Sequence, residues 1–144
     1  HLGSLGITML MNTHNVLTRG RDHLVVAGVT DLSAARHGQV GPDLGAALAG
    51  IPASAPVILL DHQPRNARTA AERSVALQLS GHTHGGMILG LDRLVARGNE
   101  GFVSGRYDLG NMTLYVSNGT GLWPGFALRL GKPSEITRFH LRAG

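Results

Sequence analysis

Apolar residues are grouped along this chain in short runs, most of which are bounded by glycine or proline. In the first third, residues 6–12 form an apolar run, residues 14–20 alternate loosely, and residues 21–31 carry a valine-rich segment that ends at a glycine turn. Short runs of this kind between turn residues are typical of β-strands. The first third is therefore predicted to form a β-meander.

The middle of the chain alternates between strand-like and helix-like patterns. Residues 41–50 begin with a Pro-Asp pair and end with a glycine, which are typical start and stop signals of a helix. Residues 55–64 show the clearest buried strand, residues 65–74 favour a short helix, and residues 75–86 give a second strand that runs into a glycine-rich loop. The strand–helix–strand order predicts a parallel pair of strands in a layered α/β domain.

The last third has weaker signals at its start and clearer ones later. Residues 87–99 show little periodicity and are interpreted as a loop, whereas residues 102–121 predict a hairpin that turns at Gly110 and Asn111. Residues 135–142 alternate between apolar and polar positions, which predicts a final strand.

Composition narrows the classes of partner. With 144 residues and 42% hydrophobic residues, one globular domain is expected. The net charge of +4 is scattered without a basic run, which argues against specific nucleic-acid binding and suits a small anionic substrate. Cysteine is absent, which excludes disulfides and thiolate metal sites. No apolar run approaches the ~20 residues of a membrane span.

Three histidines follow the ends of the two middle strands. His62 comes directly after the first, and His82 and His84 lie two residues apart after the second. Ligands bind at this edge of open α/β sheets, and neutral imidazole suits Zn, Fe, Mn and Ni. Side chains two apart in an extended loop point to opposite sides, but the surrounding glycines allow the backbone to twist until both rings reach neighbouring metal positions. The alternative, loop histidines bonded to the backbone, stays open on pattern alone.

Two stretches carry a resemblance to a known family. "LSGHTHGG" (residues 79–86) resembles the last signature of the calcineurin-like metallophosphoesterases, and "VILLDHQP" (residues 57–64) resembles the signature before it. Residues 105–142 are similar to the C-terminal part of a bacterial branch whose members are often membrane-attached. The resemblance implies a layered β-sandwich flanked by helices, namely the C-terminal half of the four-layer family fold. Residues 1–144 are thus expected to form a single domain that lacks the N-terminal half.

The resemblance also implies a chemistry. Family members hydrolyse phosphomonoesters or phosphodiesters with a metal-bound hydroxide. By position, His62 and His82 would bind one metal and His84 the other, and one or two divalent transition metal ions (Zn, Mn, Fe or Ni) are expected. The substrate is expected to be a small phosphate ester. Localisation is left open between the cytoplasm and the periphery of a membrane in a bacterium.

Supporting residues are implied in the same way. Asp61 and Thr83 would orient the metal ligands, and Asn118 would lie close enough to touch substrate. For Asp61 a solvated carboxylate at the strand end is an equal alternative, and for Asn118 a plain turn is preferred. No catalytic residue is identified. Trp123 and Phe126 are expected to form a core lid rather than a substrate platform.

The chain departs from the family in its acidic residues. The Asp-x-His, Gly-Asp and Gly-Asn-His signatures are missing, and three neutral histidines alone do not easily hold two dications. Asp31 and Asp92 are the nearest carboxylates, although nothing in their spacing supports them. The alternative function is therefore a non-catalytic metal-binding fragment, completed by a missing N-terminal segment or by dimerisation. A homodimer would also bury an uncovered sheet edge and apolar face.

The remaining histidines receive structural interpretations. His14 and His23 lie in the strand region of the first third and are expected at the surface or in turns. His140 alternates with apolar neighbours and is expected on the solvent face of the last strand.

Overall fold

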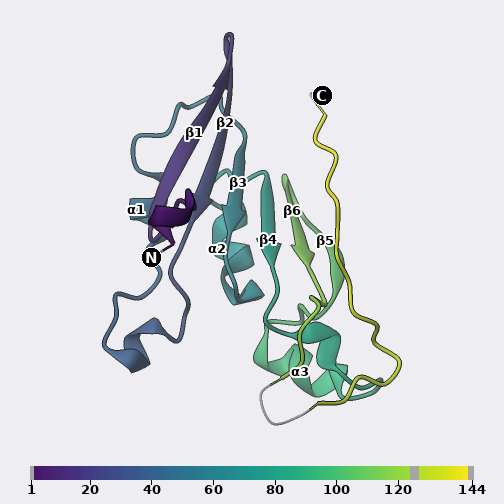
Figure 1. The fold of residues 1–144 in the computed structure, drawn as a ribbon. Helices are drawn as coiled ribbons and strands as arrows, with labels where there is room; N and C mark the ends of the chain where they lie inside the picture. Colours follow the sequence, from purple (N-terminus) through teal and green to yellow (C-terminus); the bar gives the residue numbers. More distant parts are fainter. Residues whose placement is uncertain (1, 124–126, 143–144) are drawn as a thin grey trace.

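The computed structural model describes residues 2–123 and 127–142. Six strands form one mixed sheet in the order β1-β2-β3-β4-β6-β5 (Figure 1). Their bounds are β1 Thr13–Arg19, β2 Asp22–Gly28, β3 Val57–Leu60, β4 Leu77–Ser80, β5 Gly105–Leu109 and β6 Met112–Val116. The four central strands are parallel, and an antiparallel hairpin closes each edge.

The helices are short and connect the strands. The α-helices are α1 Leu44–Leu48, α2 Ala67–Ala71 and α3 Asp92–Gly98, and the 3-10 helices are η1 Gly3–Leu5, η2 Ala34–His37, η3 Pro64–Asn66 and η4 His84–Gly86. The longest described helix has 7 residues, too few for any of them to traverse a bilayer. The predicted α/β class is confirmed, and a sheet with helices against it is consistent with part of the layered fold that the resemblance implies.

The middle of the chain follows its sequence signals closely. The Asp43 side chain accepts a hydrogen bond from the Ala46 amide at 2.9 Å and caps α1, as the Pro-Asp start predicted. Strands β3 and β4 pair in parallel, with Ile58 opposite Leu77. Helix α2 lies between them in the chain, and the hairpin of β5 and β6 turns at Gly110 and Asn111. These predictions are confirmed.

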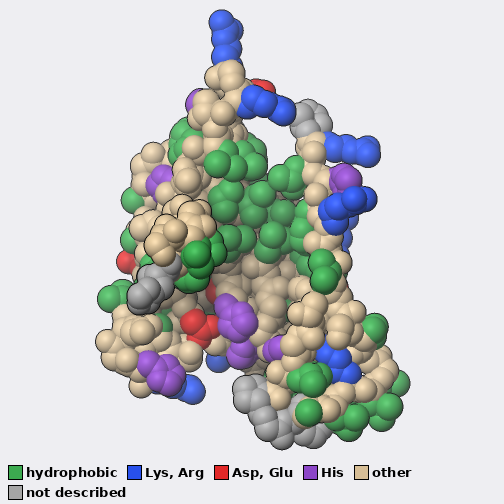
Figure 2. Space-filling model, in the orientation of Figure 1, with side chains coloured by type: hydrophobic (Ala, Val, Ile, Leu, Met, Phe, Trp, Pro, Cys, Tyr) green, Lys and Arg blue, Asp and Glu red, His purple; other side chains and the backbone are tan. Residues whose placement is uncertain are grey.

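The two faces of the sheet differ in what covers them. On one face, Val57, Leu59 and Leu114 are completely buried against α2 and against the apolar side of α1. Alternate residues point to the opposite face, which we call the open sheet face. Its members on the central strands are partly or fully exposed: Val26, Ile58, Leu60, Leu77 and Leu79. Figure 2 shows an apolar area there, between the β1–β2 hairpin and the C-terminal segment.

The predicted β-meander is wrong, because residues 6–12 do not form a strand and the first third is a hairpin of two strands. Leu10 crosses the end of β2 so closely that a Cβ on Gly28 would lie 2.6 Å from Leu10 Cβ. The side chain of Asn12 bonds to the Gly41 carbonyl at 2.8 Å and the Thr30 amide at 3.1 Å. The segment therefore ties loops together instead of pairing with a strand.

The loop predicted over residues 87–99 is wrong in its second half, where α3 forms. None of the residues of α3 is buried, and its 7 residues are too few for a helical period to be recognised in the sequence. Its ends are held locally: Val95 donates its amide to the Leu91 carbonyl at 3.1 Å, and Asn99 Nδ2 donates to the Val95 carbonyl at 2.9 Å.

The strand predicted over residues 135–142 is also wrong. The segment runs extended beside the last hairpin (Figure 1) but does not join the hydrogen-bond ladder. One backbone bond, from the Glu135 amide to the Gly119 carbonyl at 3.0 Å, holds its start, and side chains hold the rest. Tyr115 Oη bonds to Glu135 at 2.5 Å, and the Phe139 ring lies edge-on to Tyr115 with centroids 5.2 Å apart. Alternation here reflects packing of every second residue, which a single extended segment shares with a strand. His140 is exposed, as expected.

Candidate metal centre

The three predicted metal ligands lie at the carboxyl edge of the sheet. His62 follows β3, His82 follows β4, and the Gly81 amide donates to the His62 carbonyl at 3.0 Å, which joins the two loops. The rings of His62 and His82 lie edge to face with centroids 5.2 Å apart, and both side chains are exposed. Figure 2 shows histidine side chains beside an acidic group below the open sheet face.

The loop after β4 has an unusual backbone. His82 and His84 both have positive φ, at 68° and 50°, and Thr83 between them is right-handed at −75°. Left-handed non-glycine residues are uncommon and cost free energy, and they concentrate at functional sites. The twist that turns the two imidazoles is thus made by the histidines themselves and not only by the glycines. Gly86 is needed for a different reason, because a Cβ there would lie 2.7 Å from the Asp92 backbone.

His84 has different neighbours from the other two rings. Its Nδ1 lies 3.1 Å from the Gly121 carbonyl oxygen, and the Trp123 ring lies edge-on with centroids 6.3 Å apart. Arg129 donates to the carbonyls of His84 at 3.2 Å, Gly121 at 2.6 Å and Asn118 at 2.8 Å. We call this set of bonds the Arg129 clamp. No motif in the sequence singles out Arg129. Phe126, expected beside Trp123 in a lid, lies outside the described residues.

An acidic side chain does join the His62–His82 pair. Asp31 lines the same cavity of about 460 Å³ as both rings. Its carboxylate accepts hydrogen bonds from the Ser33 amide at 2.7 Å, from the Ser33 hydroxyl and from Gln63 Nε2 at 3.1 Å. Partial burial opposes ionisation, but the bonds from Ser33 and Gln63, with the nearby His62, hold the pKa of Asp31 below its ordinary value.

The order of strands in the sheet explains why Asp31 is the carboxylate that lies beside the His62–His82 pair. It follows β2, and β2 is parallel to β3, so the residues after both strands meet at one edge. The other sequence candidate, Asp92, instead pairs with Lys132 at 3.1 Å and is not among the residues that line the cavity of the pair. The order of strands in the sheet, which the sequence does not state, separates the two candidates.

The electrostatics of the pair suit a metal ligand. Partial burial lowers the pKa of His82, and the neighbouring His62 adds to this, while Asp31 acts in the opposite direction. Burial and His62 therefore favour the neutral form of the ring. A neutral imidazole is the form that donates a lone pair to a metal ion.

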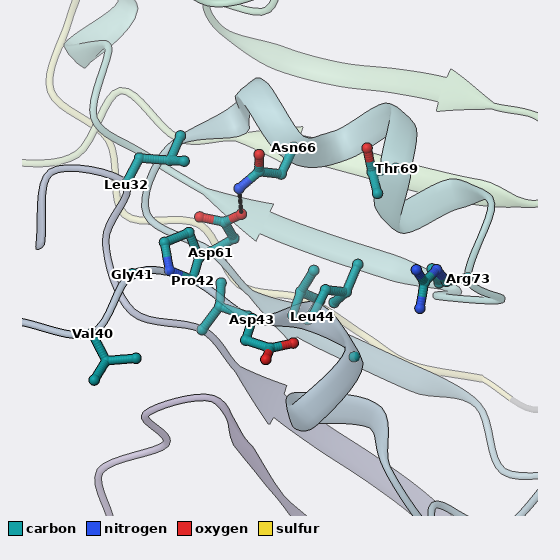
Figure 3. Close-up of a pocket in the computed structure, with 13 residues that line it drawn as sticks. Leu32, Val40, Gly41, Pro42, Asp43, Leu44, Asp61, Asn66, Thr69 and Arg73 are labelled. Atoms are coloured by element: carbon teal, nitrogen blue, oxygen red, sulfur yellow. Dashed lines mark hydrogen bonds between the residues drawn. The ribbon is translucent and has the colours of Figure 1, made fainter. Parts of the chain in front are cut away.

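Asp61 lies on the covered face of the sheet rather than beside the rings. It is 2% exposed, so a solvated carboxylate is excluded, and it points into a cavity of about 620 Å³ between α1 and α2 (Figure 3). Its carboxylate accepts from Asn66 Nδ2 at 3.1 Å and from the Gln63 amide at 3.3 Å. Burial raises the pKa of Asp61 to about 6, against the effect of these two bonds.

Thr83 and Asn118 shape the loop that carries His84. Thr83 Oγ1 donates to the Val103 carbonyl at 2.5 Å and accepts from the Gly85 amide at 3.4 Å. Asn118 Oδ1 accepts from Ser104 Oγ at 2.7 Å, and a Cβ on Gly85 would collide with it. Both side chains are buried and are used in these bonds.

The other two histidines of the strand region have structural contacts. His14 Nδ1 lies 2.9 Å from the Ala47 carbonyl oxygen, and His23 is exposed and bonds to Thr18 at 3.1 Å. His14 is half-buried and so ties β1 to α1.

The donor set fits a metal in kind but is only part of a coordination shell. Neutral imidazoles and a carboxylate are donors that Zn, Fe and Mn accept. Within residues 2–123 and 127–142, however, no three His, Asp or Glu side chains are grouped closely enough to hold one ion. The His62 and His82 rings and Asp31 line one cavity, and His84 is not among the residues that line it.

Comparison with known proteins identifies relatives of this chain. It is 44% identical over 118 residues to an uncharacterized metallophosphoesterase of Campylobacter jejuni, a match that covers 81% of this chain and 31% of the relative. It is 38% identical over 149 residues to a zebrafish (Danio rerio) transmembrane protein with a metallophosphoesterase domain, covering 98% and 34%. A phosphodiesterase of Escherichia coli is 29% identical over 143 residues, covering 97% and 49%. No family model matches the chain, and no solved structure matches it.

These matches cover most of this chain but only part of each relative. The chain spans about a third of the length of the Campylobacter and zebrafish relatives, 31% and 34%. A match that covers 81% or 98% of this chain necessarily spans residues 57–86, where both histidine stretches lie. Relatives from bacteria and animals carry the same family name. This chain belongs to the metallophosphoesterase family.

Proposed function

We propose that this chain supplies the histidine ligands of a metal-dependent phosphoesterase that hydrolyses small phosphomonoesters or phosphodiesters. The observation that carries the proposal is the His62–His82 ring pair, with centroids 5.2 Å apart, in a cavity that also contains Asp31. Exposure of both rings leaves room for an ion and a substrate. The family name of the relatives supports a metal and a phosphate ester as the reacting partners.

The residues present would divide the metal ligands between two positions. His62 and His82 would hold one divalent transition metal ion, and His84 would contribute to a second. Such ions, when bound, act as Lewis acids toward phosphate oxygens and lower the pKa of water. Neighbouring residues hold these groups in position before any ion binds. The Arg129 clamp fixes the His84 loop, and hydrogen bonds from Ser33 and Gln63 hold Asp31 in place.

The test combines metal analysis with hydrolysis. The metal content of the purified chain is measured by mass spectrometry, and p-nitrophenyl phosphate and bis(p-nitrophenyl) phosphate are supplied with and without a chelator. We expect chelator-sensitive turnover, and we expect His82→Ala to lose both metal and turnover. The exposed His140, changed to alanine, is the matched control and should have no effect. Turnover that survives both the chelator and His82→Ala would refute the proposal.

A second candidate function is a non-catalytic metal-binding fragment of such an enzyme. The incomplete donor set of the described residues favours it. It predicts at most one metal per chain and negligible turnover at any concentration. A second copy of the chain is one source of the missing ligands, because the open sheet face is apolar and uncovered by described elements. Sedimentation analysis with activity assays separates these cases: a dimer whose specific activity rises with concentration supports completion by a second copy, and a stable monomer counts against it.

A further inference from the structure

The cavity beside the His62–His82 pair also contains two arginines. Arg36 belongs to η2, which follows β2, and Arg65 belongs to η3, which follows β3. Both line the cavity of about 460 Å³ that the two rings and Asp31 line. The charge of Arg65 reaches His82, where it opposes protonation of the ring. Two arginines and the paired histidines therefore line one cavity.

Neither arginine is neutralised by a carboxylate in the described part of the chain. The ion pairs there join Arg106 to Asp108 and Lys132 to Asp92. Asp31 is the one acidic residue of the cavity, and its carboxylate is already bonded to Ser33 and Gln63. The two arginines against this one carboxylate give the lining one net positive charge, without counting the histidines. An anion in this cavity meets positive potential before any metal is considered.

Arginine is the side chain best suited to hold an anion of this kind. Its planar guanidinium donates two parallel hydrogen bonds to a phosphate or carboxylate, and it remains charged at all working pH values. A phosphodiester carries one negative charge, and its phosphate already lies against the histidines. One guanidinium group is enough to pair with that charge. The second arginine is then available to another anionic group of the same molecule.

We propose that Arg36 and Arg65 form an anion subsite next to the His62–His82 pair, so that the preferred substrates carry a second anionic group beside the scissile phosphate. A diphosphate ester is the simplest example, and a phosphate ester with a neighbouring carboxylate has the same chemistry. This inference rests on the proposed function, because the histidines position the scissile phosphate.

The first experiment measures binding and needs no turnover. The metal-free chain is titrated with methylphosphonate, methylenediphosphonate and phosphonoacetate while its amide and arginine side-chain NMR signals are followed. We expect methylenediphosphonate to bind about tenfold more tightly than methylphosphonate, with shifts at Arg36 and Arg65. Phosphonoacetate shows whether the second group must be a phosphate or can be a carboxylate.

Substitutions locate the effect. The double variant Arg36→Gln/Arg65→Gln should lose the preference for methylenediphosphonate. The matched control is Arg19→Gln/Arg21→Gln, which removes the same charge at the exposed turn between β1 and β2, at the opposite end of β2 from the cavity (Figure 1). This control should keep the preference. An unchanged preference in the Arg36/Arg65 variant, or an equal loss in the control, would overturn the subsite.

The second experiment measures selectivity in hydrolysis. The ratio of kcat/KM for a diphosphate diester to that for bis(p-nitrophenyl) phosphate should fall about tenfold in the Arg36/Arg65 variant, while its metal content stays unchanged. If the chain hydrolyses neither compound, the proposed function fails while the binding titration still decides the subsite. If turnover persists and the double variant keeps its ratio, the subsite is wrong and the proposed function stands.

Discussion

His82 and His84 are two residues apart, yet their surroundings differ in almost every respect. The His82 ring is exposed, contacts His62 and faces a cavity with a carboxylate and two arginines. The His84 ring is half-buried between Trp123 and the Gly121 carbonyl, and the Arg129 clamp holds its backbone. The backbone alternates here, with Thr83 right-handed between two left-handed histidines, and the two rings have different contacts.

The difference shows how one motif can serve two positions of unequal rigidity. At His84, hydrogen bonds to three carbonyls and a buried asparagine fix the geometry before any ligand arrives. At His62 and His82, exposure leaves both rings free to rotate toward an ion. We therefore expect changes near His84 to alter folding stability, and changes near the pair to alter charge and binding. Four substitutions test this difference between the two regions, and the expected effect decreases from the first to the last.

Gly86→Ala should have the largest effect. Gly86 has a φ of +79°, which is strained for alanine, and a Cβ there would lie only 2.7 Å from the Asp92 backbone. Rotation of a side chain cannot relieve a collision with backbone. We expect a loss of about 3 to 4 kcal/mol in the free energy of unfolding, measured by urea denaturation. Gly50→Ala is the control, since Gly50 has a φ of +77° with no atom within 4 Å, and should lose only about 1 to 2 kcal/mol. Equal losses would show that the loop around His84 yields easily.

Arg129→Gln removes the clamp and should cost about 2 to 3 kcal/mol in the free energy of unfolding, because several carbonyls lose a charged donor. The NMR signals of the His84 ring should move while those of His82 stay in place. Arg138→Gln, an exposed change in the same C-terminal segment, should alter neither quantity. A shift at His82 as large as that at His84 would mean that the two regions are not independent.

Asp61→Asn tests the buried carboxyl group that precedes His62 in the sequence. Its effect on folding stability should be measurable in the metal-free protein. The native pKa of Asp61, about 6, lies above the ordinary value of 3.8, so the folded chain holds this proton more tightly than the unfolded chain. Folding stability is therefore lost as the pH rises from about 4 to 6, by about 2 kcal/mol, and an amide does not titrate. Between pH 4 and pH 7, the free energy of unfolding of the variant should therefore rise by about 2 kcal/mol relative to that of the native chain, as measured by denaturation. Asp22→Asn, at an exposed site, should gain nothing.

Asp31→Asn should have the smallest effect on the folded chain, and it acts only at the pair. Asp31 raises the pKa of His82 against the opposite effect of burial, so removing its charge should lower the pKa of His82 further. An NMR titration of the His82 ring measures this. Asp108→Asn, which removes an exposed carboxylate paired with Arg106, should leave the titration of His82 unchanged. A rise in the pKa of His82 in the Asp31 variant would contradict the placement of Asp31.

The elements with buried faces were predictable from sequence. The run before His62 and the Pro-Asp start of α1 carry local signals strong enough to identify a strand and a helix. Helix α3 has 7 residues and none of them is buried, so it is too short for its helical period to be recognised. The segment 135–142 showed the alternation of a strand, but pairing depends on a neighbouring backbone, and the segment is held by Tyr115 instead.

The candidate site divides in the same way. The positions of His62, His82 and His84 after strand ends, and the resemblance of both stretches to family signatures, were read from the chain alone. The presence of Asp31 at the pair was not, because it depends on which strand lies beside β3. Arg36, Arg65 and Arg129 had no signal either, since a lone arginine in a loop looks the same whether it faces solvent or a cavity.

The sequence by itself determined the family, the α/β class and the three histidines, because these are written in local patterns and short signatures. Only the tertiary structure decided which groups surround each ring. The parallel order of β2, β3 and β4 brings three loops to one edge, and the His82 and His84 rings have different neighbours there, His62 and Trp123. Contacts between residues far apart in the chain depend on strand order and backbone dihedral angles, and neither is stated by the order of amino acids along one segment.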